Sequence, residues 1–137
     1  MNELVKEWVD KSEKDFATAI RENKVTEFPN YDAVCYHSQQ CIEKLMKALI
    51  LKHQGSFEYT HNLISLQNIL ITLNPIFIFE INHLKFLTRA AIDFRYPGEN
   101  ADMEEAEEAI AICDSLRSKL KEFIGNEYFT YPINFPA

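Results

Sequence analysis

The feature that most constrains the fold is the segment 39–51, which has helical spacing and becomes apolar on nearly all sides toward its end. At 100° per residue, one side of this helix carries Gln40, Lys44 and Lys47. Glu43 precedes Lys47 by four residues, which is the favourable order for an ion pair. The opposite side carries Cys41, Leu45, Ala48 and Leu49, and Ile50 and Leu51 then return to the polar side, so the helix becomes apolar nearly all round. Such a helix must be covered, either by other helices or by a second copy of the chain.

Apolar residues recur at helical spacing in five segments, and few helix breakers interrupt them. The expected helices cover residues 2–22, 31–54, 60–73, 76–95 and 102–125. Short connections between long amphipathic helices imply antiparallel neighbours. The sequence therefore predicts an all-α fold for residues 1–125, an up-and-down four-helix bundle with one additional short helix.

Residues 126–137 form a tail that is rich in aromatic residues and proline. The prolines exclude helix near its end, and so many large apolar rings disfavour disorder. We expect the tail to pack in extended form, on its own bundle or on a partner. Our hypothesis is that it helps to cover a dimer surface.

Capping residues set the expected boundaries of the helices. Gly55 is the expected C-cap of the second helix, and Thr60 is the expected N-cap of the third. Asp102 and Glu105 form a capping-box pattern at the start of the fifth helix, which Gly125 closes.

Residues 76–79 carry β-branched and aromatic side chains, which favour a strand. The segment has no partner strand and leads into helical spacing, so we interpret it as the start of the fourth helix. Pro97 disfavours helical dihedrals at Tyr96, so this helix should end near Arg95.

The balance of charge limits the partners of the chain. Fourteen lysines and arginines against 21 acidic residues give its 137 residues a formal net charge of -7. No overall field attracts a polyanion, so nucleic acid would need a local basic patch, and the sequence shows no basic run. An acidic N-terminus and the lack of a long apolar stretch argue against a secretory signal and a membrane span. We therefore expect a cytoplasmic protein, and three cysteines, an odd number, agree with a reducing compartment.

Three polar motifs occur in order along the chain. They are Gln39-Gln40-x-x-Glu43-Lys44-x-x-Lys47-Ala48, then Thr60-His61-x-Leu63, and finally Arg95-Tyr96-Pro97. Over roughly residues 1–124, this ordered set resembles the HEPN domain family. The resemblance implies a small helical bundle, usually a homodimer, in prokaryotes often encoded beside a minimal nucleotidyltransferase in a toxin–antitoxin-like pair. It also implies nucleotide binding and, in some branches of the family, RNA cleavage.

Arg95 follows the core positions of the fourth helix on the same face, so its guanidinium is expected where the core ends. It needs an acceptor, which is either a backbone carbonyl or an internal acid such as Glu43, or a phosphate or RNA. In the family's ribonuclease branches a histidine follows the corresponding arginine by four to six residues. Residues 96–102 contain no histidine. Because acid–base cleavage of RNA usually needs one, we expect no catalytic residue.

Several polar residues are candidates to join Arg95 at a nucleotide or phosphate site. His61 lies near the start of the third helix, where backbone amides favour anions; alternatively, it anchors that helix by a hydrogen bond across the loop. Lys44 and Lys47 either complement a phosphate or belong to a solvated face. The candidate ligand-binding residues are Arg95, Tyr96, His61, Gln40, Glu43, Lys44 and Lys47.

The sequence predicts no metal site and no resident cofactor. Cys35, His37 and Cys41 are close together, but on a helix only the last two share a face, and no further ligand follows at a useful spacing. Buried free cysteines are therefore expected.

Three functions remain. The first is a non-catalytic dimeric module that binds a nucleotide, partners a nucleotidyltransferase, or does both. The second is a ribonuclease toxin, which the missing histidine and the acidic charge disfavour, so RNA is the less favoured ligand. The third is a helical scaffold without a ligand.

Overall fold

The computed structural model describes residues 1–93 and 96–133. Its elements are α1 (Glu3–Asn23), α2 (Tyr31–Lys52), α3 (Leu63–Leu73), α4 (Ile81–Asp93), α5 (Met103–Ile124) and the short 3-10 helix η1 (Asn126–Tyr128). These described residues contain no strand, which confirms the predicted all-α class. The expected end of the fourth helix near Arg95 lies outside the described residues.

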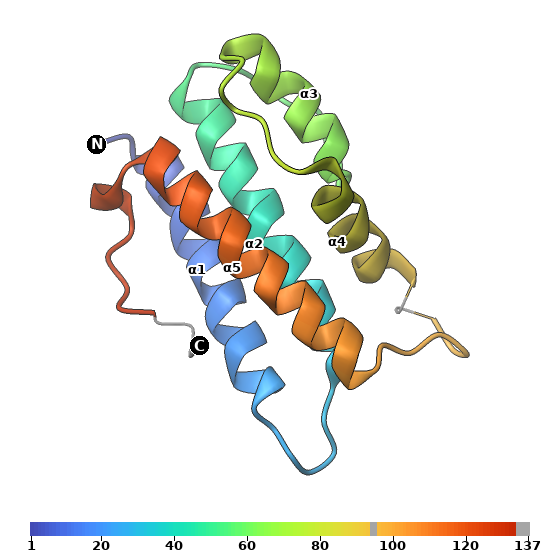
Figure 1. Ribbon diagram of the computed structural model, residues 1–137. Helices are drawn as coiled ribbons and strands as arrows, with labels where there is room; N and C mark the ends of the chain where they lie inside the picture. Colours follow the sequence, from blue (N-terminus) through green and yellow to red (C-terminus); the bar gives the residue numbers. More distant parts are fainter. Residues whose placement is uncertain (94–95, 134–137) are drawn as a thin grey trace.

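Four long helices alternate in direction along the chain. In Figure 1, α1 and α4 run opposite to α2 and α5, while the short α3 is an addition beside α4. The helix α2 contacts each of the other four α-helices. The predicted up-and-down bundle with one additional short helix is therefore confirmed, and α2 is its central element.

The burial of α2 follows from its sequence. Its apolar residues Cys41, Leu45, Ala48, Leu49 and Ile50 are all fully buried. They are covered by the other helices of the same chain. Of the two expected ways to cover this helix, other helices or a second copy of the chain, the structure shows the first. The core of the protein therefore lies around α2.

The end of α2 differs from the prediction that Gly55 caps it. The C-cap is His53, and Gln54 follows with φ 63°, the left-handed conformation that ends many helices. Gly55 donates its N–H to the Ile50 carbonyl at 2.9 Å. A Cβ atom at Gly55 would lie 3.0 Å from the side chains of both Ile50 and Leu73. The glycine is needed here because α2 and α3 approach each other closely, not because of its own φ.

The N-cap of α3 is Asn62, so the prediction of Thr60 is wrong. The Asn62 Oδ1 accepts a hydrogen bond from the Ile64 N–H at 2.9 Å. The Thr60 hydroxyl oxygen instead accepts from the Asn62 N–H at 3.1 Å. Thr60 therefore shapes the turn that leads into the cap.

The prediction that residues 76–79 start the fourth helix is also wrong, because α4 begins only at Ile81. The segment is an irregular connection that begins in a turn, in which the Phe77 N–H donates to the Asn74 carbonyl at 3.0 Å. Phe77 and Phe79 are buried, and the isoleucine before each of them is exposed. The Phe79 N–H donates to the Gln67 Oε1 at 2.6 Å. A side chain of α3 thus supplies a hydrogen-bond partner for the backbone of this irregular segment.

Both ends of α5 agree with the prediction. The Asp102 side chain accepts from the Glu105 N–H at 2.7 Å, and the Glu105 side chain accepts from the Asp102 N–H at 3.2 Å. This reciprocal pair is the capping box. At the other end, Gly125 has φ 113° and closes the helix.

The described part of the tail packs on its own bundle, which is one of the two alternatives expected, but it begins with the 3-10 helix η1 and not in the extended form predicted. Tyr128 is buried, and its hydroxyl oxygen accepts from the Asn2 N–H at 3.1 Å. The Phe129 ring lies against the guanidinium of Arg117, 5.8 Å from ring centroid to Cζ. The tail therefore joins the start of α1 to the side of α5.

One buried ion pair joins α1 to α5. Arg117 Nη2 lies 2.6 Å from Glu13 Oε1, and its Nε lies 2.8 Å from Glu13 Oε2. The Glu13 side chain is fully buried, and Arg117 stacks on Phe16 at 4.6 Å. Two parallel hydrogen bonds of this kind fix the relative position of the two helices.

We predict that Arg117→Leu lowers the free energy of unfolding by about 3–5 kcal/mol, because it leaves the Glu13 carboxylate buried without a partner. Urea unfolding followed by circular dichroism measures the change. Arg21→Leu, at an exposed arginine of α1, is the control and should change stability by less than about 0.5 kcal/mol. The double variant Glu13→Leu/Arg117→Leu should recover most of the loss. A loss below about 1 kcal/mol in the single variant would contradict the proposed role of the pair.

Candidate ligand-binding site

Glu43 is the centre of a buried polar cluster on α2, with 2% of the residue exposed. Its Oε1 accepts from Gln39 Nε2 at 3.0 Å and from Gln40 Nε2 at 3.3 Å. Its Oε2 accepts from Lys47 Nζ at 3.0 Å, which confirms the predicted ion pair. These three donors lie four residues before, three before and four after Glu43, on the same side of the helix. The hydrogen-bond partners of the buried carboxylate therefore come largely from its own helix.

A fourth donor comes from the loop before α3. The His61 Nδ1 lies 2.8 Å from Glu43 Oε1, and the His61 carbonyl accepts from Gln39 Nε2 at 3.0 Å. Because a carboxylate only accepts, the His61 Nδ1 carries the proton. The Tyr59 hydroxyl lies 2.7 Å from His61 Nε2 and donates to it when the imidazole is neutral. The result is a chain of hydrogen bonds from an exposed phenol to a buried carboxylate.

This contact agrees with the interpretation that His61 anchors the loop. The interpretation that the amides at the start of α3 hold a phosphate receives no support. The Leu63 N–H donates to the Thr88 hydroxyl oxygen at 3.3 Å, and the Ile64 N–H donates to Asn62. Two of the amides that an anion would use are therefore already engaged.

Lys47 is enclosed rather than presented to solvent. The residue is 4% exposed, and its ammonium lies over the rings of Trp8, Phe57 and Tyr59 at 5.4, 5.3 and 6.0 Å. Its charge is balanced by Glu43 and by the faces of these rings. Lys47 thus stabilises the cluster from within.

Lys44 lies apart from the cluster, although the sequence grouped it with Gln40 and Lys47. Its Nζ lies 2.6 Å from Asp15 Oδ2, and the His37 Nδ1 lies 2.8 Å from Asp15 Oδ1. Adjacent positions on a helix differ by 100°, so Lys44 faces α1 while Glu43 faces the loop before α3.

The predicted arginine, Arg95, lies outside the described residues. Tyr96 is 64% exposed and follows the end of α4. Among the candidate residues, the structure brings together Gln40, Glu43, Lys47 and His61, which come from two parts of the chain.

Beside the cluster, a cleft of about 390 Å³ lies between α2 and α4. We call it the α2–α4 cleft. Its volume falls in the range of small-molecule sites, roughly 300–1,000 Å³. Its lining residues are Tyr36, Gln39, Gln40, Tyr59, His61, Thr88, Ala91 and Ile92. A second hollow of about 380 Å³ shares Tyr36 and Ala91 with it and continues toward the start of α2.

Two aromatic residues of this cleft were missed by the sequence analysis. Tyr36 lies one helical turn before Gln40, and Tyr59 lies two residues before His61. The position of Tyr36, four residues before the candidate Gln40 and so on the same face of the helix, was visible in the sequence.

Similarity to known proteins assigns the family of this bundle. The family model described as HEPN domain matches residues 5–123. The chain belongs to the HEPN domain family. No curated protein matches it.

Two solved structures share the HEPN fold of this chain. TT1696 from Thermus thermophilus has a TM-score of 0.70 and 22% identity, and the match covers 87% of this chain and 97% of that one. ST0689, described as an archaeal HEPN homologue, has a TM-score of 0.63 and 23% identity, with 88% and 98% covered. At these identities the likeness establishes the fold alone.

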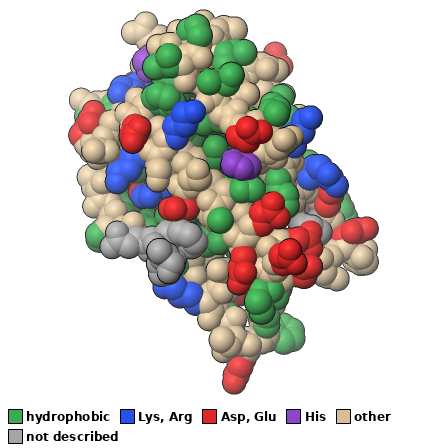
Figure 2. Space-filling model, in the orientation of Figure 1, with side chains coloured by type: hydrophobic (Ala, Val, Ile, Leu, Met, Phe, Trp, Pro, Cys, Tyr) green, Lys and Arg blue, Asp and Glu red, His purple; other side chains and the backbone are tan. Residues whose placement is uncertain are grey.

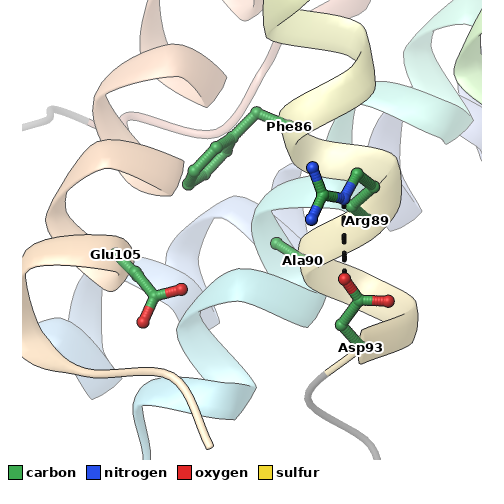
Figure 3. Close-up of a pocket in the computed structure, with 5 residues that line it drawn as sticks. All are labelled: Phe86, Arg89, Ala90, Asp93 and Glu105. Atoms are coloured by element: carbon green, nitrogen blue, oxygen red, sulfur yellow. Dashed lines mark ion pairs between the residues drawn. The ribbon is translucent and has the colours of Figure 1, made fainter. Parts of the chain in front are cut away.

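The other side of α4 in this HEPN domain carries a much smaller hollow, of about 120 Å³. Figure 3 shows Phe86, Arg89 and Asp93 of α4 facing Glu105 of α5 across it. Arg89 Nε lies 3.6 Å from Asp93 Oδ2, and the arginine side chain is 80% exposed. The hollow is too small for a nucleotide, so the α2–α4 cleft is the better candidate.

Acidic side chains gather where α5 begins, as Figure 2 shows. Burial, together with the charges of Glu105, of Asp32 in α2 itself and of Asp102, raises the pKa of the Cys35 thiol to about 12. Burial also raises the pKa of the Cys113 thiol, so both thiols stay protonated and unreactive near neutral pH.

Two further properties concern the described residues alone. None of their helices combines the length and the apolar character that crossing a membrane requires. Within residues 1–93 and 96–133, no group of three or more metal-ligating side chains is positioned to hold a metal ion.

We predict that Glu43→Gln lowers the free energy of unfolding by about 3–5 kcal/mol, because the buried Lys47 ammonium loses its counter-ion. Thermal and urea unfolding measure the loss. Glu122→Gln, at an exposed glutamate of α5, is the matched control and should stay within about 0.5 kcal/mol of the parent. Equal stability of the two variants would show that the cluster does not depend on the charge of Glu43.

Proposed function

We propose that this HEPN domain is a non-catalytic homodimeric module that binds a nucleotide in the α2–α4 cleft. The observation that carries the proposal is the buried Glu43, which fixes Gln40 and His61 at the wall of a cleft of about 390 Å³. Polar clusters beside a cavity of this size are typical of ligand sites. Arg95 and Tyr96 are assigned to the phosphate end of the ligand.

We further propose that the module partners a minimal nucleotidyltransferase in a toxin–antitoxin-like pair. Membership of the HEPN family supports this partnership, and the exposed apolar residues Tyr36 and Ile92 at the cleft supply surface for a protein contact. Co-purification with a nucleotidyltransferase encoded beside it tests the pairing. A protein that elutes alone and as a monomer would contradict both the partner and the dimer.

We predict that nucleotides stabilise the protein, because a ligand that binds only the folded state shifts unfolding by mass action. At about ten times the dissociation constant, the melting temperature should rise by about 3–6 °C. Differential scanning fluorimetry with millimolar AMP, ATP and GTP measures the shift.

Two arginine variants provide the control. Arg95→Ala should reduce the shift, whereas Arg89→Ala, which removes an exposed arginine of α4, should leave it unchanged. The absence of a shift with every nucleotide would favour the third function, a helical scaffold.

The second candidate function is an unorthodox ribonuclease, and one observation favours it. His61 is held by a carboxylate at 2.8 Å, the arrangement that orients a histidine for proton transfer. The sequence after Arg95 still lacks the family's catalytic histidine. The local acidic charge also disfavours RNA as a ligand.

We predict that purified protein leaves total RNA intact over hours at neutral pH. Gel electrophoresis of the RNA, with parent protein, Arg95→Ala and His61→Ala in parallel, measures this. Cleavage by the parent that both substitutions abolish would overturn the non-catalytic assignment and establish the ribonuclease. Cleavage that persists in both variants would indicate a contaminating nuclease.

A further inference from the structure

The positive charges near the α2–α4 cleft are already neutralised inside the protein. Lys47 is paired with Glu43, and Lys44 is paired with Asp15. His61, which lines the cleft, also bonds to Glu43. Within the described part of the chain, the wall of the cleft therefore offers no unpaired cation. A phosphate placed against this wall would lose its hydration without gaining a counter-charge.

The polar groups that remain are suited to a neutral ligand. Gln40 Nε2 donates to Gln39 Oε1 at 2.8 Å and to Glu43, so its amide protons are engaged. Gln40 Oε1 accepts no hydrogen bond from the residues that the structure describes, and the atom is accessible to solvent. Thr88 accepts from the Leu63 N–H and keeps its own hydroxyl proton. Of the residues that line the cleft, Gln40 of α2 thus keeps an unused acceptor and Thr88 of α4 an unused donor.

Exposed rings frame these two groups. Tyr36 is 39% exposed and Tyr59 is 85% exposed, and both line the cleft with Ile92. The Tyr59 ring is held against His61, with centroids 4.9 Å apart. Aromatic rings in a cleft that also holds an acceptor and a donor match a nucleobase, which stacks through its faces and bonds through its edge.

From this chemistry we infer that the α2–α4 cleft holds the base of the ligand and not its phosphate, and that it favours a base with an amino group beside a ring nitrogen. Adenine and cytosine present that edge, with the amino group donating to Gln40 Oε1 and the ring nitrogen accepting from Thr88. Uracil presents a carbonyl in place of the amino group and meets the glutamine oxygen with a second acceptor. This inference rests on the proposed nucleotide binding and assigns its specificity.

The source of the base is a free nucleotide rather than RNA. Asp32 lines the adjoining hollow, and Glu105 and Asp102 lie close enough to raise the pKa of Cys35. An RNA strand that left the cleft on this side would pass these acidic groups, which repel its successive phosphates. A mononucleotide carries its charge at one end only.

Isothermal titration with adenosine, cytidine, uridine and inorganic tripolyphosphate tests the inference. Adenosine and cytidine should bind at least about tenfold more tightly than uridine, because uridine places a carbonyl oxygen against the Gln40 acceptor and leaves both without a hydrogen bond. Tripolyphosphate should neither bind nor displace adenosine. AMP should bind more tightly than a six-nucleotide adenylate RNA, and tighter binding of the RNA would overturn the assignment to a free nucleotide.

Two tyrosine variants separate a base site from non-specific binding. Tyr36→Ala should weaken adenosine at least about fivefold, because it removes a stacking surface. Tyr131→Ala, at a similarly exposed tyrosine in the tail, should leave adenosine binding unchanged. Equal binding of the three nucleosides, or equal effects of the two variants, would overturn the inference.

The proposed function and this inference can fail separately. If nucleotides bind while nucleosides do not, and tripolyphosphate competes, the base assignment is overturned and nucleotide binding stands. If neither nucleosides nor nucleotides bind, both are overturned.

Discussion

The burial of one carboxylate, that of Glu43, governs how the loop before α3 meets the central helix. A buried carboxylate must be surrounded by donors, and helical spacing supplies three of them from α2 itself. The fourth, His61, comes from a loop that has turned back along the bundle. That contact fixes where α3 begins and places Tyr59 at the edge of the α2–α4 cleft. The cleft therefore exists where it does because Glu43 holds one of its walls.

A second buried pair, Glu13 with Arg117, acts between α1 and α5. Apolar contacts tolerate small shifts between helices, whereas two parallel hydrogen bonds between buried charges do not. The two contacts thus fix different parts of the molecule around α2. His61 with Glu43 fixes the loop before α3, and Glu13 with Arg117 fixes α1 relative to α5. The rigid frame that results leaves the cleft as the place where a ligand can add contacts.

Some local signals in the sequence were reliable, whereas the caps predicted at Gly55 and Thr60 were wrong, and long-range contacts were invisible. The capping box at Asp102 and the pair of Glu43 with Lys47 depend on residues three or four apart, so their spacing predicted them. The bond from His61 to Glu43 spans 18 residues and that from Arg117 to Glu13 spans 104, and no local pattern encodes either. Lys44 shows the same limit, since helical geometry set its direction but could not reveal that Asp15 of α1 would meet it. The segment 76–79 stays outside the helix while its phenylalanines pack in the core, as Phe77 does against Phe123, with ring centroids 4.9 Å apart.

Internal neutralisation of the lysines also bears on how an acidic protein could hold a nucleotide. With a net charge of -7, the chain gains nothing from long-range attraction of a phosphate. Under the proposed function, Arg95 is the residue assigned to the phosphate, so a single arginine contributes the charge–charge term. A single phosphate contact gives a shallow dependence of affinity on salt, by analogy with counterion release from nucleic acids. The greater part of the binding free energy must then come from stacking and edge contacts in the cleft, which makes the base, and not the number of phosphates, the feature that such a site distinguishes.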